Sequence, residues 1–195
     1  MGVLNRLLKT VFNAIFLAAA LPAAALAGFG RFKPCYSIFA NLFALAPGIF
    51  GDYLRIGFYH LTLAECPLSS RIQFGSFFAH PEARVGARVY IGSYCILGKT
   101  IIGERTQIAS GVQILSGSRQ HVRDEEGRIS GAEEGIFAPV AIGADCWIGA
   151  AAIVMADVGA GSTVGAGSVV SRPIPVNSVA VGSPAKVIRT TVEAN

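Results

Sequence analysis

The sequence predicts an all-β domain, a parallel β-helix, preceded by an apolar α-helical N-terminus. Two columns of residues carry this prediction. An aliphatic residue, usually followed by Gly or Ala, recurs about every six residues between Ile91 and Val170, and a small residue stands two positions before most of these aliphatics. Side chains alternate between the two faces of a strand, so both columns point into one narrow core. A six-residue period of strand and corner is typical of β-helices, in which three units form one triangular coil.

The two columns persist through most of the second half of the chain. The aliphatic column consists of Ile91, Leu97, Ile102, Ile108, Ile114, Ile142, Ile148, Val154, Val158, Val164 and Val170. The small column consists of Val89, Cys95, Thr100, Thr106, Val112, Val140, Cys146, Ser162 and Ser168. We interpret the shorter spacings before Ile102 and Val158 as shortened corners. Gly or Ala after the aliphatic residue is expected because a bulky side chain would crowd the corner.

The first fifty residues have the composition of membrane-associated helices. Residues 11–28 carry no charge, and as a helix they would reach about 27 Å, close to the thickness of a bilayer core. A second apolar stretch covers residues 35–50. Basic residues flank the first stretch on both sides, so charge selects no orientation: Arg6, Lys9, Arg31 and Lys33. This symmetry favours a re-entrant hairpin or interfacial helices on the cytoplasmic face of the cell membrane.

Two other interpretations of the N-terminus stay open. A single span would also leave the following domain in the cytoplasm. A cleaved signal peptide ending near Ala25-Leu26-Ala27 would instead export it.

The chain divides into apolar helices (1–50), a connector (51–79), the β-helix (80–189) and a tail (190–195). We expect the connector to form a short amphipathic helix. Two roles are open for its aromatic residues, which either lie among lipid headgroups or cap the end of the prism: Tyr53, Phe58 and Tyr59. The β-helix is interrupted at 116–139 by the polar segment SGSRQHVRDEEGRISGAEEGIFAP. A long loop that leaves a regular solenoid usually carries function.

Composition narrows the function. The chain has 195 residues, enough for one domain with an appendage, and only 14% are charged. The net charge of +4 favours an anionic partner, either a phosphate-bearing ligand or an acidic membrane surface, and we expect no nucleic-acid partner. The four cysteines show no metal-ligand spacing and are expected to be reduced structural thiols. With three histidines in all, one of them outside the coils, a three-histidine zinc site is not expected, and we predict no metal.

The β-helix portion resembles the hexapeptide-repeat acyltransferases, most closely the branch with the maltose and galactoside O-acetyltransferases. The motifs that carry the resemblance are, in order, His121 in the loop, Gly131-Ala132-Glu133, Pro139, Trp147-Ile148-Gly149, Ala166-Gly167-Ser168 and the closing segment from Gly182 to Arg189. The resemblance implies left-handed coils, a homotrimer with active sites between neighbouring subunits, and acetyl-CoA as the acyl donor. A second, shorter likeness covers residues 47–55, which resemble a segment ahead of the β-helix in polysaccharide-associated acyltransferases.

The resemblance also assigns catalytic roles. His121 occupies the position of the family's general base, and a neutral imidazole suits that role near neutral pH. Glu133 is the candidate to orient it. Its rivals in the loop are Glu134, Asp124, Glu125 and Glu126. The backbone N–H of Ala150 corresponds to the donor that stabilises the oxyanion.

Further positions correspond to substrate and cofactor contacts. Trp147 corresponds to the ring that walls the acceptor or pantetheine channel. His80 stands in the first coil, where the sugar acetyltransferases carry an acceptor-binding Asn that is absent here. The resemblance places coenzyme A along Ala150, Ala166 and Gly167, with its phosphates near Ser171, Arg172, Lys186 and Arg189. Lys186 and Arg189, three residues apart, would share one face if the segment were helical.

The sequence therefore predicts an acetyltransferase that moves an acetyl group from acetyl-CoA to a hydroxyl or amine, by direct attack with a His general base. The apolar N-terminus indicates a membrane-linked glycan or glycolipid precursor as acceptor and a location on the cytoplasmic face of the membrane. The alternative is a non-catalytic β-helix that tethers partners to a membrane. The sequence identifies neither the acceptor nor the length of the acyl chain.

Overall fold

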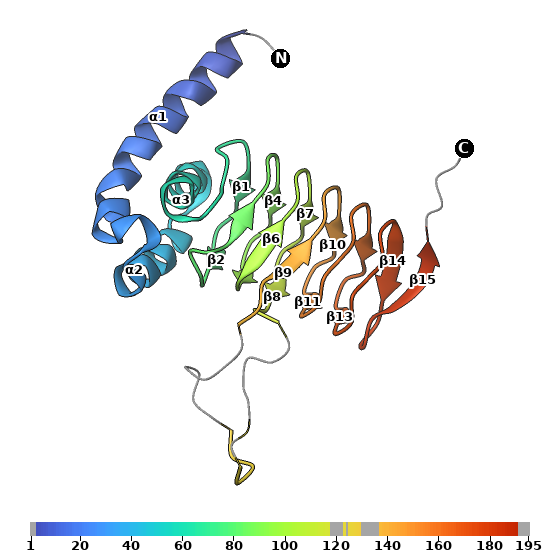
Figure 1. Ribbon diagram of the computed structural model, residues 1–195. Coiled ribbons are helices and arrows are strands. Elements are labelled where there is room, and N and C mark those ends of the chain that lie inside the picture. Colours follow the sequence, from blue (N-terminus) through green and yellow to red (C-terminus); the bar gives the residue numbers. More distant parts are fainter. Residues whose placement is uncertain (1–2, 118–122, 124, 130–136, 191–195) are drawn as a thin grey trace.

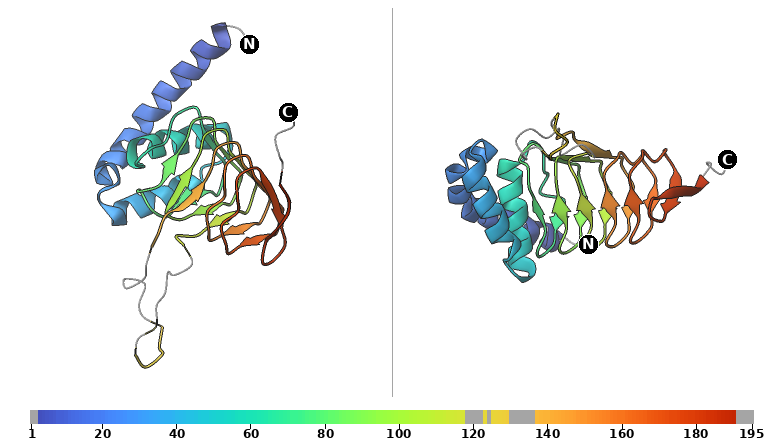
Figure 2. Two further views of the ribbon diagram at one scale, coloured as in Figure 1. Left: turned by 45° about the vertical axis from the view of Figure 1, so that its right-hand side comes forward. Right: turned by 90° about the horizontal axis from the view of Figure 1, so that it is seen from below.

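The computed structural model describes residues 3–117, 123, 125–129 and 137–190. It contains a triangular prism of short strands with three helices stacked at its N-terminal end (Figures 1 and 2). The strands form three sheets that run along the prism. All strand pairs are parallel except the last, β14 with β15, which is antiparallel. The structure therefore has the predicted β-helix architecture.

Each sheet collects one side of successive coils. The seven-stranded sheet contains β1 (Arg71–Ile72), β4 (Tyr90–Ile91), β7 (Gln107–Ile108), β10 (Trp147–Ile148), β12 (Thr163–Val164), β14 (Ser178–Val181) and β15 (Lys186–Thr190). The five-stranded sheet contains β2 (Phe77–Phe78), β5 (Ile96–Leu97), β8 (Gln113–Ile114), β11 (Ile153–Val154) and β13 (Val169–Val170). The three-stranded sheet contains β3 (Arg84–Val85), β6 (Thr100–Ile102) and β9 (Val140–Ile142), and the bridges Ile142–Val158 and Val158–Ile174 continue it.

Both predicted columns fill the prism core. Every member of the aliphatic column and of the small column is at most 2% exposed. The polar members find partners in the neighbouring coil, as at Thr106, whose Oγ1 donates to Gly143 O at 2.7 Å and accepts from Cys146 N–H at 3.1 Å. Buried hydroxyls therefore cost little, because each one joins two coils.

Glycine at the corners is required by the close stacking of coils. A Cβ atom on Gly92 would lie 2.6 Å from the backbone nitrogen of Ser110 in the next coil. A real Cβ cannot occupy that position, so the coils would have to separate. The prediction that crowding selects Gly at this corner is confirmed.

The N-terminal part folds as α1 (Val3–Leu26), the 3₁₀ turn η1 (Gly28–Gly30), α2 (Lys33–Ala44) and α3 (Gly48–Thr62). The first coil begins before the expected start of the β-helix at residue 80, because β1 and β2 already pair with β4 and β5. The segment 51–79 thus supplies most of a helix and the first two strands. Sequence periodicity missed these strands because aromatic Phe77 and Phe78 stand there instead of the repeated pattern.

Helix α3 caps the open end of the prism. Phe58 and Tyr59 are fully buried, and the Tyr59 hydroxyl accepts a hydrogen bond from the N–H of Phe78 in β2 at 3.2 Å. The hydroxyl of Tyr36 in α2 donates to the carbonyl oxygen of Phe78 at 3.0 Å. Of the two roles expected for the connector aromatics, Phe58 and Tyr59 therefore have the capping role. Tyr53 differs, because its ring packs against Phe12 and Phe16 of α1.

A buried arginine joins the helices to the first coil. Arg55 of α3 is 0% exposed and pairs with Asp52 at 2.6 Å. Its guanidinium also donates to the carbonyl oxygens of Phe43, Ala46 and Ile72 at 3.0, 2.7 and 2.9 Å. It therefore satisfies carbonyl groups at the end of α2 that the helix leaves unpaired. This network gives a structural reason for the Asp52 and Arg55 positions within the segment 47–55.

Among the described helices, one is long and apolar enough to cross a membrane, over Leu7–Leu26, and only 17% of that stretch is buried. Part of α1 packs on α3. A Cβ atom on Gly57 of α3 would lie 3.0 Å from the carbonyl oxygen of Phe16, so the two helices approach closely there. The rest of α1 extends past the prism (Figure 1).

Candidate functional site

The corner between β10 and β11 exposes backbone that carries little side chain. Ala150, Ala166 and Gly167 are all exposed, and the N–H of Gly167 donates to the carbonyl oxygen of Ala150 at 2.8 Å. Within residues 3–117 and 137–190, the N–H of Ala150 has no hydrogen-bond acceptor. The structure thus brings three predicted site residues together on adjacent coils, at a corner where the N–H groups of both Ala150 and Ala166 have no acceptor within those residues.

Trp147 stands beside this corner on the outer face of the seven-stranded sheet. It lies in register with Gln107 on one side and Thr163 on the other, and it is 60% exposed. An indole left in solvent offers a flat apolar surface and one N–H donor for a ligand. The outer face of this sheet carries a column of paired residues that we name the outer column: Arg71, Tyr90, Gln107, Trp147, Thr163, Val179 and Arg189.

Lys186 and Arg189, near the C-terminus, also lie on the outer face of the seven-stranded sheet, but not through the helical spacing considered for the sequence. Lys186 and Arg189 lie on strand β15, so the helical premise for their pairing is wrong. Lys186 pairs with Val181 and Arg189 with Val179, with an irregularity in register between these pairs. Val179 and Val181 are two residues apart and face the same side of β14, so their partners also share that side. The β-bulge therefore places both exposed cations on the outer face.

Ser171 and Arg172 are also exposed, but they follow β13 at the corner between the five-stranded and three-stranded sheets. They therefore leave the prism at a different corner from Ala150. The predicted phosphate-contacting residues are divided between two sides of one chain.

The loop leaves the prism at that second corner. Strand β8 ends at Ile114 and β9 begins at Val140, and the N–H of Ala138 donates to Ser116 O at 3.1 Å. His80 lies at this corner, with its ring 5.6 Å from the ring of Phe137. Burial lowers the pKa of His80, Lys33 and Lys99 lower it further, and Glu82 opposes them. A neutral imidazole is therefore favoured there.

The predicted base His121 and its partner Glu133 lie outside the described residues, as do Glu134 and Asp124. Glu125 and Glu126 are described and exposed, and Glu126 pairs with Arg128 at 2.8 Å. The ends of the loop and the Ala150 corner lie at two different corners of the prism, with the five-stranded sheet between them. In a single chain, the two groups of predicted site residues are separated by the width of that sheet.

The buried cysteines are poor nucleophiles. Burial raises the pKa of Cys66 to about 12 and raises the pKa of Cys95 and Cys146 above the ordinary value for a thiol. All three are therefore thiols at neutral pH, where the thiolate would be the reactive form. Within the described part of the chain, no three His, Cys, Asp or Glu side chains gather as a metal site would require.

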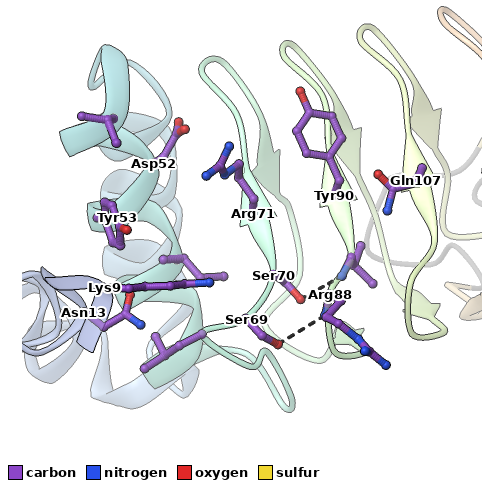
Figure 3. A pocket seen from close by; sticks show the side chains of 14 residues that line it. Lys9, Asn13, Asp52, Tyr53, Ser69, Ser70, Arg71, Arg88, Tyr90 and Gln107 are labelled. Atoms are coloured by element: carbon purple, nitrogen blue, oxygen red, sulfur yellow. Dashed lines mark hydrogen bonds between the residues drawn. The ribbon is translucent and has the colours of Figure 1, made fainter. Parts of the chain in front are cut away.

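One cavity was not predicted from the sequence. A pocket of about 290 Å³ lies between α1, α3 and the first coils, and its polar lining includes Lys9, Asn13, Arg71, Arg88 and Tyr90 (Figure 3). These residues are far apart in the sequence and belong to segments with different patterns. The available signal was Tyr90, which stands between the inward-facing Val89 and Ile91 and therefore faces outward, with Arg71 one coil earlier.

The coil architecture and the exposed corner define a hexapeptide-repeat protein. Residues 139–172 match the family model described as "Hexapeptide repeat of succinyl-transferase". This match and the similarities below confirm the resemblance to hexapeptide-repeat acyltransferases found in the sequence.

The relatives are named as acetyltransferases. A "Putative acetyltransferase" of Schizosaccharomyces pombe is 43% identical over 90 residues, which are 45% of this chain and 42% of that protein. A "Putative acetyltransferase" of Saccharomyces cerevisiae is 39% identical over 119 residues, 55% of this chain and 59% of that protein. The chain thus spans about half the length of these curated relatives.

Among solved structures, a maltose O-acetyltransferase from Clostridium difficile is 25% identical, with a TM-score of 0.70 over 87% of this chain and 91% of that one. A hexapeptide-repeat acetyltransferase from Vibrio cholerae shares the fold, with 21% identity and a TM-score of 0.57 over 87% of this chain and 94% of that one. These likenesses imply the left-handed coil that the sequence resemblance had suggested.

Proposed function

We propose that this protein transfers an acetyl group from acetyl-CoA to a hydroxyl or amine of a membrane-linked glycan or glycolipid precursor. The observation that carries the proposal is the unused N–H of Ala150, at an exposed corner beside the exposed ring of Trp147. Acyl transfer needs a fixed donor where the carbonyl oxygen becomes an oxyanion, and an unengaged backbone N–H provides one.

The proposed base is His121. Its imidazole takes the proton from the acceptor as the acceptor oxygen or nitrogen attacks the thioester carbonyl carbon. Glu133 holds the ring in the required orientation. The tetrahedral intermediate places its negative oxygen against Ala150 N–H. Collapse of the intermediate breaks the carbon–sulfur bond and releases coenzyme A, whose sulfur leaves as the thiolate or receives the proton from the imidazolium.

Transfer is direct in this proposal, with no acyl-enzyme. A cysteine nucleophile would require a thiolate, and the raised pKa values of Cys66, Cys95 and Cys146 disfavour it.

The donor lies along the exposed corner. The pantetheine arm has amide groups that hydrogen-bond to backbone, and the small side chains of Ala150, Ala166 and Gly167 leave the backbone accessible. Lys186 and Arg189 offer positive charge to the phosphates from the outer face of the same sheet. Ser171 and Arg172 emerge at the other corner of the chain, so they would serve a coenzyme A bound against the neighbouring subunit.

The active site is completed by a second subunit. Within one chain, the loop that carries His121 begins at one corner and Ala150 lies at another, with the five-stranded sheet between them. In a homotrimer of parallel prisms, the loop of one subunit reaches the Ala150 corner of the next. His80 of the first coil, whose ring contacts Phe137 at the end of that loop, then faces the acceptor.

The N-terminal helices attach the protein to the cytoplasmic face of the membrane. Large apolar side chains are exposed along this part of the chain: Leu7, Leu8, Val11, Ile15, Leu21, Leu26, Phe29, Phe32, Ile38, Leu42, Leu45, Ile49 and Phe50. The stacked rings of Phe16 and Tyr53, 5.7 Å apart, favour retention of α1 over its removal as a signal peptide. Cleavage after residue 27 would expose the apolar side of α3.

A kinetic comparison of two histidine variants tests the chemistry. Release of coenzyme A from acetyl-CoA is measured with membrane extract as acceptor. We expect His121→Asn to lower the rate by about 10²-fold or more, the contribution of a positioned base. The matched variant His60→Asn removes a histidine whose ring nitrogen Nδ1 lies 2.8 Å from Cys66 O, far from the loop in the sequence, and should retain the rate. Full activity in His121→Asn would refute the base, and no thiol release by the wild type would leave the non-catalytic tether as the function.

Membrane attachment needs a separate test. We expect the protein to stay in the membrane fraction through washes with high salt, because exposed apolar surface rather than charge holds it there. Release by salt alone would refute insertion and leave only electrostatic attachment.

A further inference from the structure

The pocket at the N-terminal end of the prism is built from two different parts of the chain. Helices α1 and α3 contribute Lys9, Asn13 and Asp52, and the first coils contribute Arg71, Arg88 and Tyr90. In Figure 3, the Lys9 side chain extends from the helices toward the coils, and Arg71, Tyr90 and Gln107 stand in a row on successive strands. The pocket is therefore continuous with the outer column that leads to Trp147.

The charge of the pocket is positive. Lys9 and Arg71 form no ion pair within the described residues, and the nearest carboxylate to Arg88 is that of Glu104, at 3.7 Å. The one acidic residue in the lining, Asp52, is already occupied: Arg55 holds one oxygen at 2.6 Å and Gln73 holds the other at 2.7 Å. Three cations thus face a cavity whose only carboxylate is neutralised.

Asn13 adds a polar residue to the lining. Its Oδ1 atom is buried and has no hydrogen-bond partner among the described residues, so this atom is not open to the cavity. The cations therefore determine the class of ligand, which carries negative charge.

The position of the pocket identifies the source of that charge. Its helical wall is α1, whose outward residues Leu7, Leu8 and Val11 are exposed apolar side chains. A lysine beside such a surface places its ammonium group at the level of lipid headgroups while its stem stays in apolar surroundings. The anionic groups at the headgroup level of a membrane are the phosphate esters of its lipids.

We propose that this pocket binds the phosphate headgroup of a membrane lipid and, where that lipid carries the acceptor glycan, aligns the glycan along the outer column toward Trp147. Arg71 and Trp147 are three strand spacings apart, about 14 Å at the usual separation between strands. The pocket would therefore fix the lipid end of the acceptor while the glycan reaches the Ala150 corner. The second half of this inference rests on the proposed acetyl transfer, and the first half does not.

Calorimetric binding to the full chain in detergent micelles tests the pocket. The probes are dihexanoyl phosphatidic acid, dihexanoyl phosphatidylcholine and inorganic phosphate. We expect the wild type to bind phosphatidic acid more tightly than the other two. Because hydrogen bonds to charged groups are worth more than neutral ones, Lys9→Gln and Arg71→Gln should each weaken this binding by about tenfold or more. Both residues are exposed, so these changes leave the core intact.

Arg84→Gln is the matched control. It removes one positive charge from an exposed arginine on the three-stranded sheet, away from the pocket, and should leave binding unchanged. Equal loss in Arg84→Gln would show that bulk charge, not the pocket, binds the lipid. Wild-type affinity in both pocket variants would overturn the site, and equal affinity for inorganic phosphate would overturn the lipid assignment. Since no acetyl-CoA is present, these outcomes are independent of the result for His121→Asn.

Discussion

Replacement of the buried Arg55 by methionine should strongly destabilise the protein. Methionine keeps an unbranched apolar stem but removes the guanidinium, which hydrogen-bonds to Ile72 O, Phe43 O and Ala46 O and pairs with Asp52. The change therefore leaves several buried carbonyl oxygens without this donor and leaves the Asp52 carboxylate with Gln73 but without its cation.

The size of the effect follows from these contacts. Breaking a buried ion pair by removing one partner typically costs about 3–5 kcal/mol, and each buried acceptor left unpaired costs about 1–3 kcal/mol. The side chain of Asp52 is 18% exposed, so water can enter beside it. That water recovers part of the cost of the unpaired acceptors. We expect a net loss of about 3–5 kcal/mol, a large share of the total stability of about 5–15 kcal/mol usual for a domain.

Urea unfolding of the full chain in mild detergent, followed by circular dichroism, measures the loss. Arg84→Met is the control, because Arg84 is exposed and 3.8 Å from Glu65, and exposed pairs contribute at most about 1 kcal/mol. Arg55→Lys keeps the charge opposite Asp52 but has fewer donors for the carbonyl oxygens, so it should fall between the wild type and Arg55→Met. A loss below about 1 kcal/mol in Arg55→Met would refute the idea that this network holds the helices on the prism.

Three further predictions concern the prism. Gly92→Ala should lower the free energy of unfolding by about 1–3 kcal/mol, because its Cβ would lie 2.6 Å from backbone in the next coil. Its control is Gly127→Asn, which lies in open space with a left-handed φ and should be neutral in the same urea titration. Burial lowers the pKa of His80, so the unfolded chain takes up the proton first as the pH falls. Stability should therefore decrease as the pH drops from about 6.5 toward the lower pKa of the folded state, and a pH titration of the melting temperature should show less of this decrease in His80→Gln. In the native protein, iodoacetamide at neutral pH should modify the partly exposed Cys35 and spare Cys66, because burial raises the pKa of Cys66 to about 12. Mass spectrometry that found Cys66 modified first would contradict this prediction.

The burial of the repeated inward positions could be predicted, because every coil offers such a residue the same narrow core. The inward position of a strand tolerates only residues that fit a narrow core, so Ile108, Val164 and Ser168 could be assigned from spacing alone. Ala150 and Gly167 were indicated by the family resemblance instead, and the structure places both at an exposed corner. Spacing failed at the first coil, where the ring of Phe78 contacts Tyr59 of the capping helix and the repeated pattern is absent.

Contacts between distant segments could not be read from any pattern. The shared face of Lys186 and Arg189 arises from a β-bulge, and a local rule based on helical spacing gave the right neighbours for the wrong reason. The basic pocket needs α1 to pack across α3, which brings Lys9 beside Arg71.

The sequence by itself determined the β-helix, the inward columns and the family, because these follow from a periodicity in which each residue's face is fixed by its neighbours along the chain. Only the tertiary structure decided that Arg55 ties the helices to the first coil, that Asn13 lines a basic cavity, and that the loop begins at a different corner from Ala150. Those facts depend on how the helical end docks on the prism and on which sheet each strand joins, and the docking energy is spread over residues that share no period.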